Sequence, residues 1–405
     1  MAKKLSSVLG IDIGSQTIKV AEIRTTGREP SISALGMTAT PEGAVDHTGI
    51  FNPDAVAGAL KALISECGAT VNQAVVSIAG QASVLVRTLE VPRMNDDELK
   101  EHMQWEINRN IPFAESTVVS DFRKLPEEDP GSANVDVVMA ISPQSAIDTV
   151  VQAVKKSGRS LAAIDVEPLA IGRCLELCYG DVLGTDPVCV VDMGAKTTAI
   201  NVYSGGKILM PRQVPIGGDA ITSAIAQAMG MSNTEADQLK QARASIPESA
   251  ATGGGMGGAT GGFQPYNPFA DETSAFVPPG FEAAPEPSAP AASDPLPVPS
   301  EDAETMRLFN SFSGVLDEFT GEVRRSIDYF RSRGGDVRRI LLAGGAAKIP
   351  GMAQYLSKSL GIECDAFDPT RRLNINVRKV APGFIDDHKQ EFVVAIGNGL
   401  HIFFD

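Results

Sequence analysis

The chain has 405 residues, of which 43% are hydrophobic and 21% charged, with a formal net charge of −15 and a sequence pI near 4.8. This length exceeds the roughly 250 to 300 residues at which a single hydrophobic core stops growing, which excludes one small domain. The acidic balance disfavours nucleic-acid binding and attachment to a membrane through a basic face.

The cysteines and the apolar segments indicate a cytoplasmic protein. Five cysteines lie mostly in apolar segments and form no C-x-x-C pair. Cys174 and Cys178 share a helix face without an accompanying histidine, so we expect buried free thiols rather than a metal site. No stretch approaches the roughly 20 apolar residues that span a bilayer, and the N-terminus lacks the apolar region of a signal peptide. We therefore expect no direct membrane insertion.

Predicted strands and helices alternate along the first half of the chain, which indicates layered α/β architecture. In the helix predicted at 96–110, Leu99, Met103 and Ile107 recur at intervals of four, so we expect them to form its buried face. We expect residues 135 to 166 to form a β-α-β unit. In chain order the predicted elements are strands at 8–13, 17–24 and 31–38, a helix at 53–67, strands at 73–80 and 83–91, the helix at 96–110, a strand at 135–142, a helix at 143–157, a strand at 161–166 and a helix from 167 to about 178.

The pattern that opens the chain returns in its second half. VLGIDIGSQT and VCVVDMGAKTT each combine an apolar strand, an aspartate, a glycine and a polar turn, and Asp192 follows Asp12 by 180 positions. This repetition predicts one unit used twice and hence two similar lobes. Further elements are predicted as helices at 218–230 and 234–244, a long helix at 301–333, a strand at 337–345, a helix from about 351 to 360 and a closing strand-helix segment from 363.

Residues 247–300 differ from the rest of the chain in composition. Glycine, alanine, proline and serine dominate this segment, and it has almost no β-branched residues. Such a segment cannot bury enough apolar surface to offset the entropy of ordering, so we expect a disordered insertion.

Three glycine-bearing turns follow apolar strands, in IDIGSQTIK, VDMGAKTT and LLAGGAAKIPG. Glycine lets backbone N–H groups approach phosphate oxygens closely, and the neighbouring hydroxyl and lysine side chains add donors. Asp12 and Asp192, just before the first two glycines, can each hold a hydrated Mg²⁺. A single D-x-G turn is better explained as an ordinary tight hairpin, but two copies followed by an A-G-G turn favour a nucleotide site.

The order of DIG, EP, DMG, GGD and LLAGG resembles the nucleotide-binding signature of the superfamily of actin, Hsp70 and sugar kinases. Within it, residues 98–125 and 138–176 resemble type IV pilus assembly proteins of the PilM family, above all in the pattern W-E-x-x-x-x-I-P-F that begins at Trp105. This resemblance implies an α/β protein with the actin-like ATPase fold, made of duplicated RNase H-like lobes, an additional 1C subdomain of the FtsA and PilM type, and a disordered insertion in the second lobe.

The resemblance also assigns the parts of the chain. It implies a first lobe that begins at 1–77, the 1C-like subdomain at 78–160, a return to the first lobe with a connecting helix at 161–186, the second lobe at 187–246, the insertion at 247–300, the continued second lobe with an adenosine loop at 301–370 and a return to the first lobe at 371–405.

The same resemblance implies ATP and Mg²⁺ as ligands and gives roles to individual residues. Glu167 matches the connecting-helix carboxylate that orients water or the metal shell, and with Asp192 it is the candidate catalytic pair. Glu235 and Lys240 fall where the ribose and adenine would bind, with solvated helix charges as the alternative. The implied first phosphate loop is Asp12, Gly14, Ser15 and Gln16 with Lys19 beside it, the second is Asp192, Gly194, Ala195, Lys196 and Thr197, Gly217 and Gly218 lie near the nucleotide, Gly344, Gly345 and Ala346 lie under the adenosine, and Asp12 and Asp192 hold Mg²⁺ through water.

The function implied is a cytoplasmic ATP-binding scaffold of type IV pilus assembly with weak or no ATPase activity. It would bind the N-terminal tail of a PilN-like bitopic inner-membrane protein, and so associate peripherally with that membrane; other pilus assembly proteins and self-association are further options. Trp105 projects away from the apolar helix face and is a candidate partner contact, with core packing as the alternative.

Two other functions stay open from the sequence. A phosphotransferase of the sugar or acetate kinase type would need a further catalytic acid beside the second phosphate loop, and none is evident. A filament-forming cell-division protein of the FtsA type would end in an amphipathic membrane helix, and we expect none after GNGLHIFFD.

Overall fold

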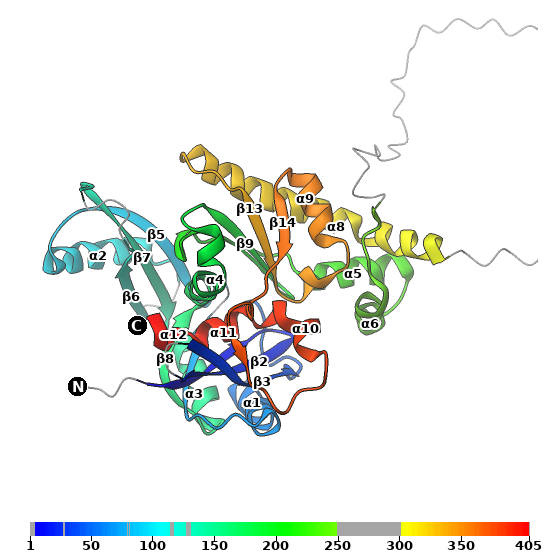
Figure 1. Cartoon of the computed structure of the whole chain (residues 1–405), viewed down its shortest axis with the longest axis horizontal. Coiled ribbons are helices and arrows are strands. Elements are labelled where there is room, and N and C mark those ends of the chain that lie inside the picture. Colours follow the sequence, from blue (N-terminus) through cyan, green and yellow to red (C-terminus); the bar gives the residue numbers. More distant parts are fainter. Residues whose placement is uncertain are drawn as a thin grey trace, which may run out of the picture.

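The computed structural model describes residues 5–26, 29–78, 80, 82–113, 117–126, 131–248 and 301–404. The predicted insertion at 247–300 lies outside the described residues from position 249 onward. The described chain contains two large sheets, one in each lobe, and a smaller third sheet at one end of the molecule (Figure 1).

The sheet of the first lobe has the strand order β15-β3-β2-β1-β4-β8. β1, β2 and β3 form the predicted antiparallel meander, and β4 and β8 continue the sheet in parallel. Helices α1 and α3 pack on one face, where their apolar residues share a core with Leu9, Ile11 and Val76. The bounds are β1 Ser7–Ile13, β2 Thr17–Thr26, β3 Glu29–Ala39, α1 Pro53–Cys67, β4 Gln73–Ile78, α3 Gln144–Lys156, β8 Ser160–Val166 and β15 Asn374–Ile375.

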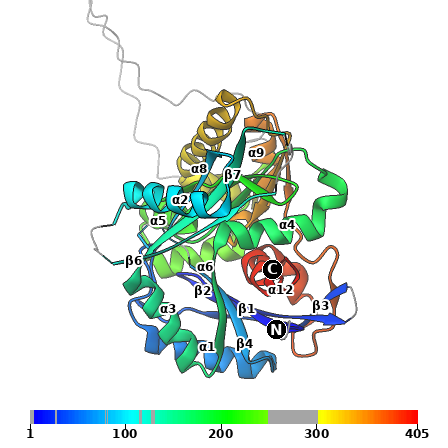
Figure 2. The same ribbon diagram turned by 90° about the vertical axis from the view of Figure 1, so that its left-hand side faces the viewer.

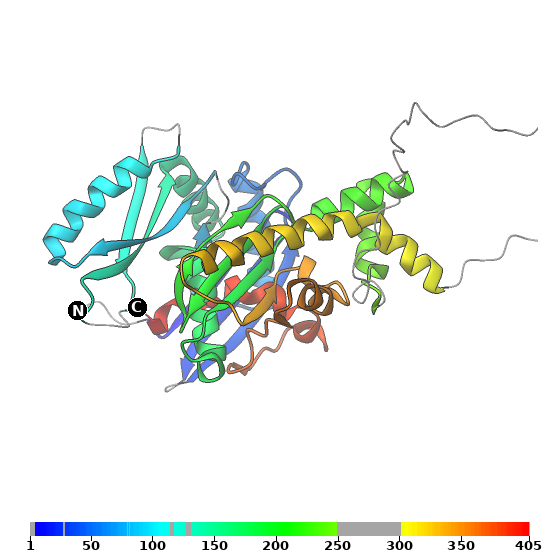
Figure 3. The ribbon, with the colours of Figure 1, turned by 90° about the horizontal axis from the view of Figure 1, so that it is seen from above.

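The sheet of the second lobe has the order β11-β10-β9-β13-β14, with β12 paired to β10. Helices α5, α6, α8 and α9 contribute to the core on its outer face, and Figure 3 shows α8 as the long helix that lies along this lobe. The bounds are β9 Val188–Met193, β10 Thr198–Ser204, β11 Lys207–Met210, β12 Gln213–Val214, α5 Gly218–Met229, α6 Asn233–Arg243, α8 Glu301–Ser332, β13 Arg339–Ala343, α9 Met352–Leu360 and β14 Glu363–Ala366.

Helices α4 (Glu167–Leu183) and α11 (Val393–Gly399) lie between the two large sheets (Figure 2). Their apolar residues form one core with strand residues of both lobes, for example Ile23 and Val190. The helices cross very closely, because a Cβ atom on Gly397 would lie 2.0 Å from the carbonyl oxygen of Ala170. Because this core contains residues of both lobes, the helix pair joins the two lobes. The chain then ends in α12 (His401–Phe404).

The first strands of the two lobes repeat one hairpin, as the sequence predicted. Ile13 pairs with Ile18 at the end of the β1–β2 hairpin, and Met193 pairs with Thr198 at the equivalent place in β9–β10. In each turn the glycine N–H donates to a threonine carbonyl at 3.0 Å, from Gly14 to Thr17 and from Gly194 to Thr197.

The third sheet has the order β5-β7-β6 and is covered by α2, the cyan helix in Figure 3. Leu99, Met103 and Ile107 form the buried face of α2, as predicted. The predicted β-α-β unit is wrong, because β7 belongs to this sheet whereas β8 pairs with β4 in the first lobe, and α3 packs on α1. The bounds are β5 Leu85–Pro92, α2 Asp96–Asn110, β6 Val118–Lys124 and β7 Asn134–Pro143.

The third sheet is attached to the second lobe by polar contacts. Lys207 Nζ in β11 lies 2.7 Å from Asp136 Oδ2 in β7, and the Thr88 hydroxyl in β5 donates to the carbonyl of Leu209 at 2.8 Å. A movement of the second lobe would therefore act directly on this sheet.

The sequence also led to expectations about the five cysteines and about membrane-spanning segments. All five cysteines are buried and free, as predicted. Within the described ranges, no helix is both long and apolar enough to cross a bilayer.

Candidate functional site

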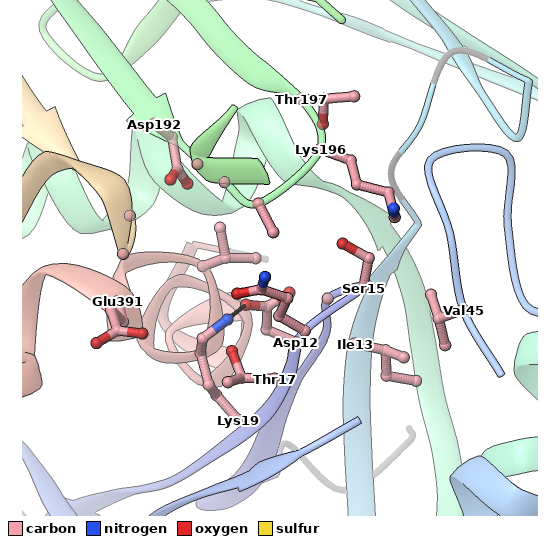
Figure 4. Close-up of a pocket in the computed structure, with 18 of the residues that line it drawn as sticks. Asp12, Ile13, Ser15, Thr17, Lys19, Val45, Asp192, Lys196, Thr197 and Glu391 are labelled. Carbon is pink, nitrogen blue, oxygen red and sulfur yellow. Dashed lines mark hydrogen bonds and ion pairs between the residues drawn. The ribbon is translucent and has the colours of Figure 1, made fainter. Parts of the chain in front are cut away.

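A cavity of about 580 Å³ lies between the two large sheets and is lined from both lobes (Figure 4). This volume is typical of a site for a small molecule or cofactor. Figure 4 shows Asp12, Ser15 and Lys19 of the first lobe facing Asp192 and Lys196 of the second. The predicted residues that line it are Asp12, Gly14, Ser15, Gln16, Lys19, Glu167, Asp192, Gly194, Ala195, Lys196, Thr197, Gly218, Lys240, Gly344, Gly345 and Ala346.

The turn after β1 is fixed by backbone contacts that require glycine. A Cβ atom on Gly14 would lie 2.9 Å from the Thr17 carbonyl oxygen, which is closer than real Cβ contacts allow. The Thr40 hydroxyl donates to the Gly14 carbonyl at 2.7 Å, and Thr40 N donates to the Gln16 carbonyl at 2.9 Å. These contacts fix the geometry of the loop.

The turn after β9 is held against the start of α5. Gly218 N donates to the Gly194 carbonyl at 2.9 Å, and Asp219 N donates to the Ala195 carbonyl at 2.8 Å. A Cβ atom on Gly217 would lie 2.4 Å from the Ala195 carbonyl oxygen, so this approach needs glycine. Gly217 supports the loop from behind and does not itself line the cavity.

The A-G-G turn after β13 lies directly against Asp192. Gly344 has a φ of +85°, and a Cβ atom there would be 2.4 Å from Asp192 Oδ1. Its N–H donates to the carbonyl of Gln390 at 2.9 Å, in the segment that returns to the first lobe. All three glycine turns thus meet at one cavity.

The two aspartates of the repeated hairpins have different partners. Asp12 pairs across its hairpin with Lys19, and Lys19 Nζ lies 3.0 Å from Asp12 Oδ2. Although burial alone would lower it, the Asp12 carboxylate holds the pKa of Lys19 above its usual value. Asp192 pairs instead with Ala199, so the second hairpin has no cation at this position.

Burial and mutual repulsion raise the pKa values of two carboxyls in the cavity. Burial first, and then the Asp12 carboxylate, raise the pKa of Asp192 to about 7. Burial, Asp192 and Asp12 raise the pKa of Glu167, at the start of α4, to about 8. Among the residues that the structure describes, neither carboxylate accepts a hydrogen bond. Two carboxylates that lack a hydrogen-bond donor favour the binding of a cation beside them.

A magnesium ion would be held here indirectly. In the described parts of the chain, no three side chains of histidine, cysteine, aspartate or glutamate stand close enough together to bind a metal ion themselves. Mg²⁺ usually keeps several waters and is bound through one or two carboxylates together with substrate phosphates. Asp12 and Asp192 fit that indirect role, with phosphate oxygens supplying the rest.

Besides Gly217, two predicted residues lie outside the cavity. The Glu235 carboxylate accepts hydrogen bonds from the N–H and hydroxyl of Ser232, at 2.9 and 2.7 Å, and so caps α6. Trp105 is 56% exposed on the outer face of α2, which excludes core packing, and the Arg109 guanidinium lies 5.2 Å from its ring centroid.

The sequence did not identify a cluster that closes the cavity beside the A-G-G turn. Lys348 Nζ and His388 Nδ1 lie 2.7 and 2.8 Å from Glu391 Oε1, and all three residues line the cavity. Burial alone would raise the pKa of Glu391, but the bonds from Lys348 and His388 lower it below its usual value. Lys348 lies in the recognised glycine turn, whereas the other two belong to α10 (Phe384–His388) and the following 3-10 turn at Lys389–Phe392.

The cavity continues past the first glycine turn into a groove in the first lobe. Its lining there includes Asp46, His47, Ser83 and Thr149. The Ser83 hydroxyl donates to the Thr48 carbonyl at 2.5 Å, and the Ser142 hydroxyl donates to the Ser83 carbonyl at 2.7 Å. Ser83 thereby connects this groove to the end of β7 in the third sheet.

Comparisons with known proteins relate the chain to two families. The family described as "Type IV pilus assembly protein PilM" matches residues 10–252, and "Cell division protein FtsA" matches residues 189–397. FtsA of Neisseria meningitidis serogroup B is 24% identical over 253 residues, which are 57% of this chain. The chain spans 59% of the length of that relative.

Solved structures resemble the chain over nearly its whole length. A structure titled "PilM-PilN type IV pilus biogenesis complex" has a TM-score of 0.76 at 24% identity and covers 99% of both chains. The ethanolamine utilization protein EutJ from Carboxydothermus hydrogenoformans has a TM-score of 0.51 at 15% identity and covers 98% of this chain and 91% of its own. At these identities the likeness concerns the fold.

Proposed function

Because the chain belongs to the PilM family of type IV pilus assembly proteins, we propose that it is a cytoplasmic ATP-binding scaffold of the pilus assembly machinery, held at the inner membrane by a PilN-like protein. Its fold is the actin-like ATPase fold, with a second lobe similar to FtsA. The actin-like fold was predicted from the sequence.

The convergence of three glycine turns on one cavity is the observation that carries the nucleotide site. The turns that contain Gly14, Gly194 and Gly344 surround a space that also contains the ammonium groups of Lys19 and Lys196, while the N–H groups of these three glycines bond within the protein. Donors of this kind suit the phosphates of ATP, and the carboxylates of Asp12 and Asp192 suit the hydrated Mg²⁺ that accompanies them. When bound, the metal would neutralise the phosphate charge.

The nucleotide would serve mainly as a conformational ligand. It would touch both lobes, so it favours the arrangement of lobes that it fits best. The contacts from Lys207 to Asp136 and from Thr88 to Leu209 would transmit that arrangement to the third sheet. This coupling supports a scaffold whose partner-binding part responds to the bound nucleotide.

The partner would be the N-terminal cytoplasmic tail of a PilN-like bitopic membrane protein. The groove beyond the first glycine turn supports this proposal, because it reaches from the phosphate region to Ser83, which is bonded to the end of β7 in the third sheet. Trp105 offers a second contact on α2, since an exposed tryptophan beside an arginine is typical of interface anchors.

Filling the groove or truncating the exposed tryptophan is expected to weaken binding of this tail. Thr149→Arg on α3 would place a long side chain in the groove, and Trp105→Ala would remove the aromatic contact. Each change is expected to lower the affinity for a synthetic PilN N-terminal peptide about tenfold, as measured by fluorescence anisotropy with the full chain.

Tyr329→Ala is the matched control for Trp105→Ala. Tyr329 is 53% exposed on α8, and the Arg333 guanidinium lies 6.0 Å from its ring centroid. This control should leave the affinity unchanged. Unaltered binding by Thr149→Arg would contradict the groove assignment, and equal effects of the two aromatic changes would contradict the role of Trp105.

A further inference from the structure

The Asp219 carboxylate, which does not itself line the cavity, joins the two phosphate loops. Gln16 Nε2 of the first lobe donates to Asp219 Oδ1 of the second at 2.7 Å, although the residues are 203 positions apart. The other carboxylate oxygen, Asp219 Oδ2, lies 3.2 Å from Lys196 Nζ. Asp219 therefore engages one donor from each of the two loops.

Asp219 is fixed to the second loop and cannot follow the first. It stands in the first turn of α5, and its N–H donates to the Ala195 carbonyl at 2.8 Å. The preceding residue, Gly218, is bonded in the same way to Gly194. A separation of the lobes at this point must therefore break the bond between Gln16 and Asp219.

A terminal phosphate would compete with Asp219 for the same donors. Gln16 and Lys196 both line the cavity, and both are donors of the type that binds phosphate oxygens. The third phosphate of a triphosphate would also bring negative charge close to the Asp219 carboxylate, and like charges at short range repel. A diphosphate lacks this group and leaves both bonds of Asp219 in place.

We propose that Asp219 determines how this chain distinguishes nucleoside triphosphates from diphosphates, and that its bond to Gln16 is the contact through which the lobes detect the terminal phosphate. This inference rests on the nucleotide site proposed above. With a diphosphate bound, Asp219 keeps its contacts with Gln16 and Lys196. The terminal phosphate of a triphosphate accepts hydrogen bonds from Gln16 and Lys196 in place of Asp219, so the contact between the two loops breaks.

The test is the ratio of two affinities in the Asp219→Asn variant of the full chain. Asparagine keeps the size of the side chain and an oxygen acceptor for Gln16 but removes the negative charge. ADP and a non-hydrolysable ATP analogue are titrated calorimetrically, with Mg²⁺ and with EDTA. The preference for the triphosphate analogue over ADP is expected to rise about tenfold, with most of the change in the affinity for the analogue.

Asp96→Asn is the matched control. Its carboxylate also pairs with a lysine, Lys124 Nζ at 2.6 Å, but this pair lies within the third sheet and its helix α2 and joins neither of the two loops. This variant should keep the wild-type ratio. An unchanged ratio in Asp219→Asn overturns the inference, and so does a ratio shifted toward ADP, because the carboxylate would then support the triphosphate complex. Failure of the wild-type chain to bind either nucleotide would instead overturn the proposed site itself.

Discussion

Asp192→Asn is expected to make the ligand-free protein more stable at pH 8 and, in the same molecule, to weaken Mg²⁺-dependent ATP binding by about 10- to 100-fold. Both effects have one cause. The Asp192 carboxylate is half-buried near Asp12 with no cation opposite it in its hairpin, and desolvation together with the Asp12 charge raises its pKa to about 7. The negative charge of Asp192 is unfavourable in the ligand-free protein and becomes favourable when a hydrated metal ion binds beside it.

The pH dependence of this effect has a definite sign. An aspartate in the unfolded chain ionises near pH 4, so between about pH 4 and pH 7 the folded protein holds a proton that the unfolded chain has lost. The contribution of Asp192 to the free energy of unfolding therefore falls as the pH rises through this window and stays low above it. Asparagine does not ionise, so in the Asp192→Asn variant this position no longer lowers the free energy of unfolding as the pH rises.

Urea unfolding at pH 5 and at pH 8 measures the difference. The gain in stability from Asp192→Asn is expected to be larger at pH 8 than at pH 5, by about 1 kcal/mol or more. Asp186→Asn changes an exposed aspartate just before the same strand and should show no such difference. A variant that is equally destabilised at both values, or that binds Mg²⁺ and ATP like the wild type, would contradict the role given to Asp192.

Gly397→Ala is expected to lower the free energy of unfolding by about 3 kcal/mol or more. A Cβ atom at this position would lie 2.0 Å from the Ala170 carbonyl oxygen, where α11 crosses α4. The position of a Cβ atom is fixed by its own backbone, and the Ala170 oxygen belongs to a helix backbone, so no side-chain rotation can relieve the overlap. The helices would have to separate, which opens the core that both lobes share.

Gly180→Ala provides the control within the same pair of helices. Gly180 also lies in α4, but nothing stands within 4 Å of a Cβ atom there. Because alanine favours the helix more than glycine does, this change is expected to stabilise the protein by about 0.5 to 1 kcal/mol in the same urea experiment. A loss below 1 kcal/mol for Gly397→Ala would show that the crossing is looser than described.

The sequence predicted those parts of the fold that local patterns determine. The repeated strand-aspartate-glycine pattern revealed the two equivalent hairpins, and the spacing of Leu99, Met103 and Ile107 gave the buried face of α2. The sheet that a strand joins depends on distant partners, which is why β7 was wrongly grouped with β8. β6 was missed because its residues are largely exposed on both faces and show no clear alternation.

The candidate site could be predicted where glycine carries the signal. Gln16 and Asp219 stood in recognised motifs, but a bond between residues so far apart has no local signature. Glu391 and His388 lacked any motif, since they reach the cavity only through the fold of the returning segment. For Glu235 a signal was present, because Ser232 followed three residues later by glutamate is a capping-box pattern.

The most direct test of the account is calorimetric titration of ATP into the full chain in the presence of Mg²⁺. One site per chain is predicted, with an affinity that falls on removal of Mg²⁺ by EDTA and falls again in Asp192→Ala. Absence of binding, more than one site per chain, or binding that survives the loss of Asp192 would contradict a nucleotide clamp built from the three glycine turns.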